Sequence, residues 1–246
     1  MKSIILAAGS ARRLSPLTDN KHKSLLEIGS KPILEYQLDA LNHHGVSNVL
    51  IVVGFLKEQI INRYGNRYKN LKIRYMDNPN YATTNTVYSL WLASEYFKSE
   101  DFLYFNADVL FHHSLVGRLL KSEKESTLGV EIKKCGEEEV KVIPDEDQRV
   151  IRIGKKIDPN KSIGEFVGIG KFGASLTKDF ITSLKSVIDN GDQMSFFEKA
   201  VDLILDKHKI YYEDITEIPV IEIDFPEDLE KAENVILPEI LSFGDE

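Results

Sequence analysis

Strand-like and helix-like segments alternate along the first half of the chain, and this alternation constrains the fold more than any other sequence feature. Each short apolar run that suits a buried strand is followed by a segment with helical spacing, such as the stripe of Leu34, Leu38 and Leu41. The pattern predicts strands at 3–8, 48–53, 71–76 and 101–106, and helices at 32–43, 57–64 and 86–97. Such an order is typical of a mainly parallel sheet with helices on its faces.

The second half of the chain changes to a different pattern. From about residue 127 to 172, short alternating stretches such as 140–143 and 149–153 predict antiparallel strands added to the parallel core. We expect helices at 176–190 and 194–207, strands at 210–212 and 220–223, and a closing helix at 226–237. No linker, repeat or low-complexity tract is visible, so we expect residues 1–246 to form a single α/β domain. Its sheet should be Rossmann-like and mixed, with an inserted antiparallel portion.

The composition excludes several classes of protein. Hydrophobic residues make up 42% and charged residues 28% of the 246, which is typical of a globular protein. No apolar run approaches the roughly 20 residues of a membrane helix, and the apolar start at 4–8 is too short for a signal peptide. We therefore expect no membrane insertion and a cytoplasmic location. The net charge of -8 works against a nucleic-acid surface.

Neither the cysteine nor the histidines predict a reactive centre. The single cysteine, Cys135, allows no internal disulfide and no cysteine metal cluster, and we expect it to be inert. The six histidines show no Ser-His-Asp order and no metal-ligand spacing. His43 and His44 lie at the end of a predicted helix, where solvated imidazoles are common, and receive no role.

The segment after the first predicted strand carries the strongest chemical signal. Residues 6–18 leave the strand through small residues and then present Arg12 and Arg13, and Lys21 and Lys23 follow. Ligands bind at the carboxyl ends of strands in an open parallel sheet, where small residues let backbone N–H groups approach phosphate oxygens. Arginine and lysine add charged contacts to such oxygens. The loop therefore predicts a polyphosphate site, with a solvated basic loop as the alternative, and it matches neither a P-loop nor the Rossmann glycine triplet.

Residues 6–18, followed by Lys23, resemble the N-terminal motif of the nucleoside-triphosphate transferase family, the pyrophosphorylases that make nucleotide sugars and related activated alcohols. The resemblance implies a GT-A-like nucleotidyltransferase fold in which Arg13 and Lys23 hold the triphosphate and stabilise the departing pyrophosphate. It places the nucleotide against Leu6, Ala8, Gly9, Ser10 and Ala11. Two positions depart from the family pattern, because Ala11 replaces a glycine and His22 replaces a proline. An alanine at this place is expected to need a negative φ or a wider loop.

Two aspartates from distant parts of the chain are candidate metal ligands. Asp108 stands near the end of the fourth predicted strand, and Asp224 lies in segment 222–229. Both have a structural alternative, because aspartate suits turns and helix caps and Asp224 with Glu227 has the spacing of a capping box. A triphosphate is highly charged, and Mg²⁺ binds through one or two carboxylates together with substrate phosphates. The family uses aspartates at both positions, so the resemblance implies Mg²⁺ at Asp108 and Asp224.

The loop at 77–91 is expected to select the second substrate. Asn78 precedes a proline in a turn signal and Asn85 suits a helix cap, so both have structural alternatives. The loop resembles that of the branch that transfers CMP to phosphocholine or to aminoalkyl phosphonates. This likeness implies nucleotide contacts from Asn78, Tyr81 and Asn85, and an acceptor contact from Trp91, which also has the spacing of a core residue. Further acceptor contacts are implied for one of Lys155 and Lys156, and for Glu165 and Gly168.

Together these observations predict a Mg²⁺-dependent cytidylyltransferase that joins CTP to a small phosphorylated alcohol or phosphonate and releases pyrophosphate. The acceptor phosphate is mostly dianionic at neutral pH and can itself attack the α-phosphorus, so no protein nucleophile is required. The alternatives are a sugar-1-phosphate nucleotidyltransferase that uses dTTP, UTP or GTP, and a non-catalytic nucleotide-sensing module. The expected partners are small-molecule substrates, not nucleic acid or a membrane, and the oligomeric state, including a homodimer, stays open.

Overall fold

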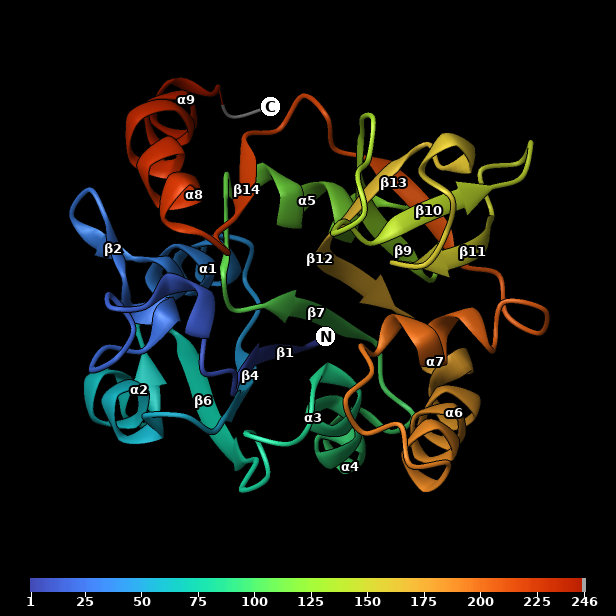
Figure 1. Ribbon diagram of the computed structural model, residues 1–246, viewed down its shortest axis with the longest axis horizontal. Helices are drawn as coiled ribbons and strands as arrows, with labels where there is room; N and C mark the ends of the chain where they lie inside the picture. The colour runs from blue at the N-terminus through green and yellow to red at the C-terminus, as the bar shows by residue number, and fades with distance from the viewer. Residues whose placement is uncertain (245–246) are drawn as a thin grey trace.

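Four parallel strands form the centre of the molecule (Figure 1), as the alternating pattern predicts. The computed structural model describes residues 1–244. The central strands lie in the order β7 (Phe102–Asn106), β1 (Lys2–Ala7), β4 (Asn48–Val53) and β6 (Leu71–Asp77). In this register Ile4 pairs with Leu50 on one side and with Tyr104 on the other. Because the four strands point the same way, their carboxyl ends share one edge of the sheet.

An antiparallel portion extends the sheet beyond β7, which confirms the predicted insertion. It begins with β12 (Gly164–Phe172), which pairs antiparallel with β7. The further strands of the sheet are β9 (Thr127–Ile132), β10 (Lys141–Pro144), β11 (Val150–Gly154), β13 (Tyr211–Asp214) and, at the opposite edge, β5 (Arg67–Tyr68). Of these only β13 runs parallel to its neighbour, β9. Two small ladders lie apart from the main sheet: β2 (Glu27–Ile28) with β3 (Lys31–Pro32), and β8 (Val109–Phe111) with β14 (Val220–Glu222).

Helices cover both faces of the sheet because its central strands are apolar on both sides. In β1, Ile4 and Leu6 join one hydrophobic core, and Ile5 and Ala7 join the other. The first core is covered by α3 (Thr86–Leu92), α6 (Thr177–Asp189) and α7 (Glu198–Asp202). The second is covered by α1 (Ile33–His43), α2 (Lys57–Tyr64) and α5 (Ser114–Lys121). Among residues 1–244 there is no helix that combines the length and the apolar character needed to cross a membrane.

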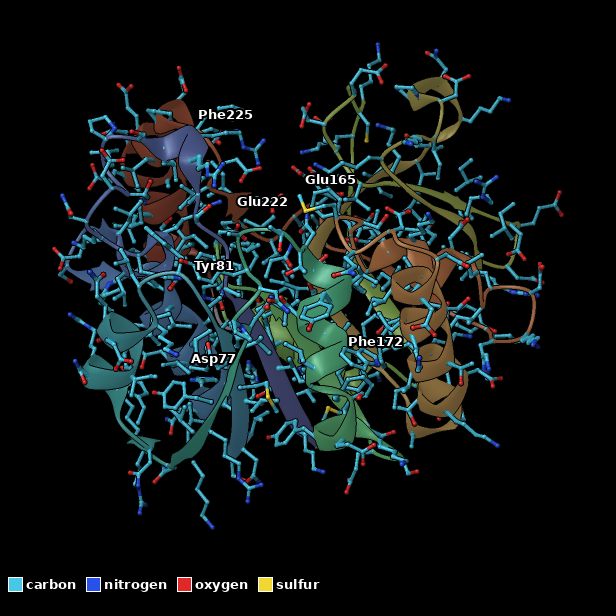
Figure 2. The ribbon with its side chains drawn as sticks, turned by 60° about the horizontal axis from the view of Figure 1, so that its bottom comes forward. Asp77, Tyr81, Glu165, Phe172, Glu222 and Phe225 are labelled. Atoms are coloured by element: carbon cyan, nitrogen blue, oxygen red, sulfur yellow. The ribbon has the colours of Figure 1, made fainter. Side chains whose placement is uncertain are left out.

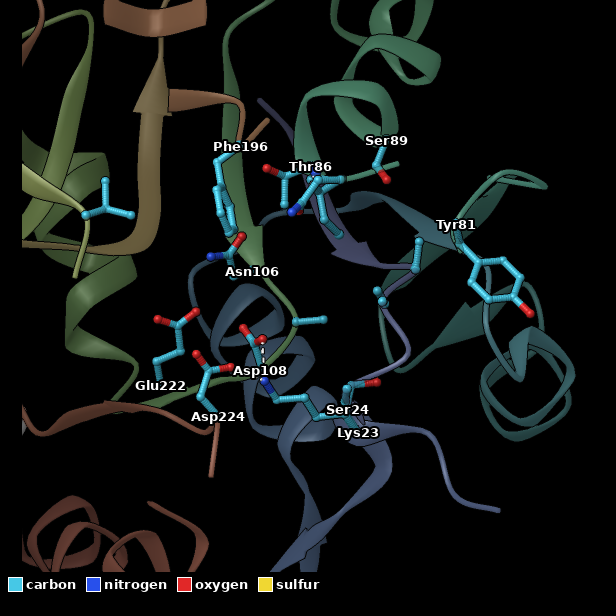
Figure 3. A pocket seen from close by; sticks show the side chains of 18 of the residues that line it. Lys23, Ser24, Tyr81, Thr86, Ser89, Asn106, Asp108, Phe196, Glu222 and Asp224 are labelled. Carbon is cyan, nitrogen blue, oxygen red and sulfur yellow. Dashed lines mark hydrogen bonds and ion pairs between the residues drawn. The ribbon is translucent and has the colours of Figure 1, made fainter. Parts of the chain in front are cut away.

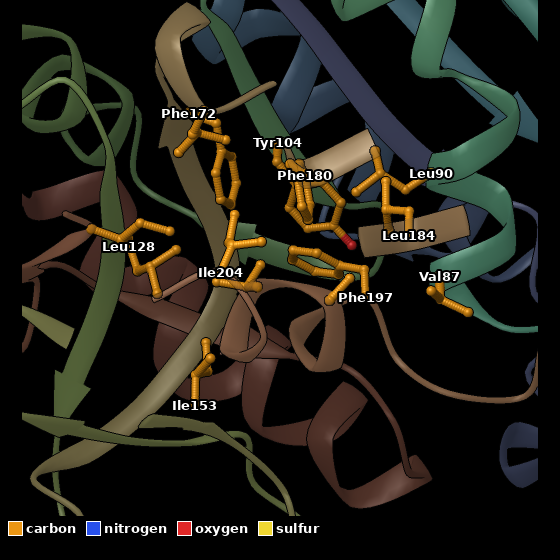
Figure 4. Close-up of a cluster of buried hydrophobic side chains, with 14 of the residues drawn as sticks. Val87, Leu90, Tyr104, Leu128, Ile153, Phe172, Phe180, Leu184, Phe197 and Ile204 are labelled. Carbon is orange, nitrogen blue, oxygen red and sulfur yellow. The ribbon is translucent and has the colours of Figure 1, made fainter. Parts of the chain in front are cut away.

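Aromatic side chains join the parallel and antiparallel portions in the first core (Figure 4). The rings of Phe172 and Phe180 stack with centroids 5.6 Å apart, and the Phe197 ring lies 4.2 Å from that of Tyr104. All four side chains are fully buried. A buried aromatic ring contributes about 1.5–3 kcal/mol to the free energy of unfolding. This cluster therefore holds α6 and the segment before α7 firmly against β7 and β12.

Three predicted helices differ from the observed ones. The helix expected at 86–97 divides at Ala93 into α3 and α4 (Ser94–Phe97). The helix expected at 194–207 is confined to α7, because residues 193–197 form hydrogen bonds with the start of α3. The Asn85 N–H donates to the Gln193 carbonyl, and the Phe197 N–H donates to the Thr86 hydroxyl. The closing helix runs as α8 (Pro226–Lys231), a π-helical stretch (Ala232–Ile236) and α9 (Leu237–Ser242).

Candidate active site

A cavity of about 270 Å³ lies at the carboxyl ends of the parallel strands. Figure 2 shows Tyr81, Glu222 and Glu165, which line it from three different parts of the chain. Most of the residues singled out from the sequence also line it: Leu6, Ala8, Gly9, Ala11, Arg13, Lys23, Asn78, Tyr81, Asn85, Asp108, Lys155, Glu165 and Asp224. Ser10, Lys156, Gly168 and Trp91 are not among the lining residues. The strand edge expected to bind a ligand therefore carries a cavity.

The first loop leaves β1 at Ala7 and turns sharply at Ala11. Ala11 adopts φ 47° and ψ 44°, so the expectation of a negative φ at this alanine is wrong. The left-handed conformation is held from both sides, because the Ala11 carbonyl accepts hydrogen bonds from the Thr18 hydroxyl at 2.9 Å and the Leu14 N–H at 3.0 Å. An L-residue pays roughly 1 kcal/mol for this conformation. Ala11 thus makes the turn in a conformation that glycine adopts without this cost.

His22, the second departure from the family pattern, fastens the loop to the end of β1. Its ring is buried, and its Nε2–H donates to the Ala7 carbonyl at 2.9 Å. Nδ1 accepts from the Ser24 N–H at 3.1 Å and so caps the short 3-10 helix that carries Lys23. Burial lowers the pKa of His22 to about 4, so the ring is neutral at pH 7. The histidine therefore positions Lys23, a role that its sequence position alone does not reveal.

Lys23 joins the two predicted metal ligands (Figure 3). Its Nζ lies 2.8 Å from Asp108 Oδ2 and 2.8 Å from Asp224 Oδ1, and Arg13 Nη2 lies 2.6 Å from Asp224 Oδ2. Burial disfavours the charged ammonium, but the carboxylates of Asp108 and Asp224 outweigh it and raise the pKa of Lys23. These four side chains come from the first loop, the end of β7 and the segment after β14, and they form one charged cluster.

The β8–β14 ladder brings the distant segments together. Val109 pairs with Glu222, and the Ile223 N–H donates to the Asp108 carbonyl at 3.0 Å. Asp224 itself does not cap α8; the N-cap residue is Phe225, and the carboxylate of Asp228 in the first turn accepts from the Asp224 and Phe225 N–H groups. The alternative capping box with Glu227 is therefore not formed, and the Asp224 side chain is left for Lys23 and Arg13.

Glu222 is a third carboxylate of the cluster, and sequence reasoning assigned it no role. One oxygen from each of Asp108, Glu222 and Asp224 lies within 4.8 Å of the others. Burial, followed by the neighbouring Asp108 and Asp224 carboxylates, raises the pKa of Glu222 far above its usual range. The available signal was the spacing of two between residues 222 and 224, which turns side chains to one side wherever the chain is extended.

The cluster fits a divalent cation. Asp108 Oδ1 is buried and has no hydrogen-bond partner within the described chain, while Lys23 contacts only the other oxygen of that carboxylate. An all-carboxylate donor set suits a hard cation such as Mg²⁺ or Ca²⁺. Asp108, Glu222 and Asp224 are therefore the side chains that would hold one.

The loop at 77–91 is held by the hydrogen bonds of its two asparagines. The Asn78 side chain is buried and donates to Thr84 Oγ1 at 3.1 Å and Ser89 Oγ at 3.0 Å. Asn85 caps α3 by accepting from the Thr86 N–H at 2.8 Å. The structural alternatives for both residues are thus realised, and both also line the cavity. Trp91 instead packs toward the core beside Tyr88, with ring centroids 5.6 Å apart.

The two candidate lysines, Lys155 and Lys156, differ in their position relative to the cavity. Lys155 lines it, with its ammonium 4.6 Å from the centroid of the Phe196 ring, whereas Lys156 does not. Glu165 lines it too and pairs with Lys133 at 2.6 Å, while burial raises the pKa of its carboxyl. Gly168 has φ 74°, and a Cβ there would lie 2.4 Å from Asn106 Nδ2. Its glycine is therefore required by the close approach of β12 to β7.

Glu198 and Phe196 are cavity residues that sequence reasoning missed. Glu198 is only 3% exposed, and its Oε2 has no hydrogen-bond partner in residues 1–244. Burial raises the pKa of its carboxyl to about 7. Local sequence gave no signal, because both residues fall in the segment expected to be an ordinary helix at 194–207.

Comparison with known proteins supports the family that the first loop resembles. Residues 2–217 match the family described as nucleotidyl transferase, whose members typically use a divalent metal ion. A choline-phosphate cytidylyltransferase of Streptococcus pneumoniae is 42% identical over 98 residues, which are 39% of this chain and 40% of that protein. A CMP-5'-(3-aminopropyl)phosphonate synthase of Streptomyces rubellomurinus is 34% identical over 128 residues, 52% of this chain and 20% of that protein. The matches thus span less than half the length of these two relatives.

A solved structure extends the likeness to nearly the whole chain. The CTP:phosphocholine cytidylyltransferase from Streptococcus pneumoniae superposes with a TM-score of 0.77 at 27% identity, covering 95% of this chain and 98% of that one. The expected fold, a mixed and mainly parallel sheet flanked by helices as in GT-A-like nucleotidyltransferases, is confirmed. The chain belongs to the nucleotidyl transferase family and is a nucleotidyltransferase enzyme.

Proposed function

We propose that the protein is a Mg²⁺-dependent cytidylyltransferase that transfers CMP from CTP to a small phosphorylated alcohol or phosphonate with a cationic head group, of the phosphocholine or 2-aminoethylphosphonate type. The observation that carries the proposal is the cluster in which Lys23 joins Asp108 to Asp224 across 116 residues of chain, with Arg13 beside them. The choice of CTP rests on the similar cytidylyltransferase and CMP-phosphonate synthase described above.

The cluster supplies what in-line nucleotidyl transfer requires. A divalent ion held by Asp108, Glu222 and Asp224 supplies charge neutralisation and orientation of the phosphates. Arg13 and Lys23 bind the triphosphate and stabilise the charge that develops on departing pyrophosphate. The dianionic acceptor oxygen attacks the α-phosphorus, and the residues that line the cavity hold the two substrates in line. No protein base is needed for this chemistry.

The part of the cavity lined by Lys155, Phe196 and Glu198 suits an acceptor that carries both an anionic and a cationic group. The Lys155 ammonium provides a partner for the acceptor phosphate. Nearby, the unpartnered Oε2 of Glu198 and the ring of Phe196, which is 39% exposed, offer a carboxyl and an aromatic face to an ammonium group. A bound cation lowers the pKa of a neighbouring carboxyl, so Glu198 would ionise on binding.

The test measures pyrophosphate release with CTP, UTP, GTP and dTTP against phosphocholine, 2-aminoethylphosphonate and several sugar 1-phosphates, with and without Mg²⁺. We expect turnover with CTP and a cationic acceptor, and turnover lower by orders of magnitude in the Asp108→Asn variant. Turnover confined to a sugar 1-phosphate would replace the cytidylyl assignment by a sugar-nucleotide one. Silence across the whole panel, with nucleotide binding retained, would favour a nucleotide-sensing module.

A further inference from the structure

Three histidines converge where α1 ends and α5 begins, and none of them lines the active-site cavity. His43 ends α1 and His44 follows it, while His113 directly precedes α5, 69 residues beyond His44. One ring nitrogen from each lies within 4.8 Å of the other two. The ring centroids are 4.0 Å apart for His43 and His113, and 4.9 Å apart for His43 and His44. The fold therefore creates an imidazole cluster that the sequence spacing does not show.

The His44 ring is fixed in this cluster by the packing of α1 against α5 (Figure 1). It occupies the space left by Gly117, where a Cβ would lie 2.7 Å from His44 Cε1. Its Nε2 lies 2.8 Å from the His113 carbonyl oxygen. A carbonyl only accepts, so Nε2 carries the proton and Nδ1 holds the lone pair of the neutral ring. Nε2 also lies 3.4 Å from His113 Nδ1. A hydrogen bond from one ring nitrogen to a backbone carbonyl is the arrangement that orients histidines for metal binding.

The carbonyl end of α1 lies beside the cluster and carries partial negative charge that favours a cation there.

We propose that His43, His44 and His113 bind one divalent transition-metal ion of the Zn²⁺ class, with solvent completing its coordination. A tetrahedral ion with metal–nitrogen distances near 2.0–2.1 Å needs ligand nitrogens about 3.4 Å apart. His43 is exposed and can rotate to close the remaining gap. The site differs in chemistry from the active-site cluster, because imidazoles select Zn²⁺, Ni²⁺ or Cu²⁺, whereas carboxylates suit Mg²⁺. A bound ion would tie the end of α1 to the start of α5.

The experiment titrates Zn²⁺ into the untagged, full-length protein by calorimetry, with millimolar Mg²⁺ present to occupy the carboxylate cluster. We expect one Zn²⁺ per chain with micromolar affinity, and a higher melting temperature with Zn²⁺ than with a chelator. His43→Gln and His113→Gln should each weaken binding by at least about tenfold. His208→Gln is the matched control, because His208 pairs with Asp179 outside the cluster, and it should bind Zn²⁺ like the wild type.

A second readout identifies the ligands directly. Co²⁺ substituted at the site should give the visible absorption of a nitrogen-ligated ion, and this spectrum should persist in Cys135→Ser. Zn²⁺ affinity unchanged in both His43→Gln and His113→Gln would overturn the proposal, as would the absence of stoichiometric binding up to about 100 μM Zn²⁺. Because His43 is exposed, its glutamine variant is expected to fold, and its melting temperature in chelator checks this.

Discussion

Replacing Lys23 by methionine tests the charged cluster most directly. Methionine is unbranched and one atom shorter than lysine, and it leaves Asp108 and Asp224 close together without the ammonium between them. Removing one partner of a buried ion pair costs about 3–5 kcal/mol of folding free energy. The aspartate side chains are each 24% exposed, so water screens part of the repulsion and we expect a loss of about 2–3 kcal/mol at pH 7.

The pH dependence of this loss separates the charge effect from a packing effect. In the wild type, Lys23 and Arg13 outweigh burial and lower the pKa of Asp224, so its stabilising contribution is present above the unfolded pKa and is lost only as pH falls through the lower folded value. In Lys23→Met the carboxylates have lost the ammonium, and one of them should take up a proton at a higher pH. The destabilisation should therefore be smaller near pH 5 than near pH 7. Pure packing loss would give the same value at both.

Denaturant unfolding of wild type and Lys23→Met, with and without Mg²⁺, provides the assay. Because the ammonium no longer competes for the carboxylates, Mg²⁺ should stabilise the variant more than it stabilises the wild type. Turnover should fall by about 10²–10³-fold from loss of charge stabilisation. Equal stability of the two proteins at pH 7, together with an equal response to Mg²⁺, would refute the reasoning.

Four further substitutions test other parts of the structure. Asp108→Asn should lower turnover by orders of magnitude while the protein still folds, because Lys23 keeps Asp224 as its partner, and full activity would remove Asp108 from the mechanism. Burial raises the pKa of Glu198 to about 7, so the stability it contributes is complete below its unfolded pKa and disappears as pH rises through 7. In unfolding measurements at pH 5 and pH 8, Glu198→Gln should remove up to about 3 kcal/mol of this pH dependence, and an unaltered profile would contradict the burial argument. His22→Ala should cost about 2 kcal/mol in denaturant unfolding and lower kcat, because the Ala7 carbonyl loses its donor and Lys23 its support; a shift in KM alone would argue against positioning. Ala11→Gly should change the free energy of unfolding by less than about 1 kcal/mol, since relief of the positive φ is offset by entropy, and a larger loss would show that the turn depends on the alanine methyl.

The parallel core could be predicted from sequence because its signals are local. Residues 48–53 and 57–64 coincide with β4 and α2, since apolar runs buried on both faces and helical stripes need no partner to be recognised. The helix expected at 194–207 could not be corrected from sequence, because residues 193–197 are held by hydrogen bonds to the start of α3, more than 100 positions earlier. The three-residue strand β8 is likewise too short to show a period, whereas the strand expected at 220–223 coincides with β14.

The candidate site likewise contains residues that local motifs predict and residues that only the fold brings to the cavity. Arg13, Lys23 and Asp108 lie in or beside local motifs, and the structure brings them together with Asp224. Their catalytic roles stay predictions. Glu198 reaches the cavity through aromatic packing, and no local pattern encodes that approach.

The ladder between β8 and β14 brings Glu222 and Asp224 to the active site, so the site is complete only after these residues have been synthesised. A chain growing on the ribosome can build β1, β4 and β7 and the first loop while residues beyond 219 are still unmade. Such an intermediate has Lys23 and Asp108, but neither Glu222 nor Asp224. With the proposed ligands, chemistry on a bound triphosphate must await the synthesis of residues 222–224, so a product truncated before them would sequester nucleotide without consuming it.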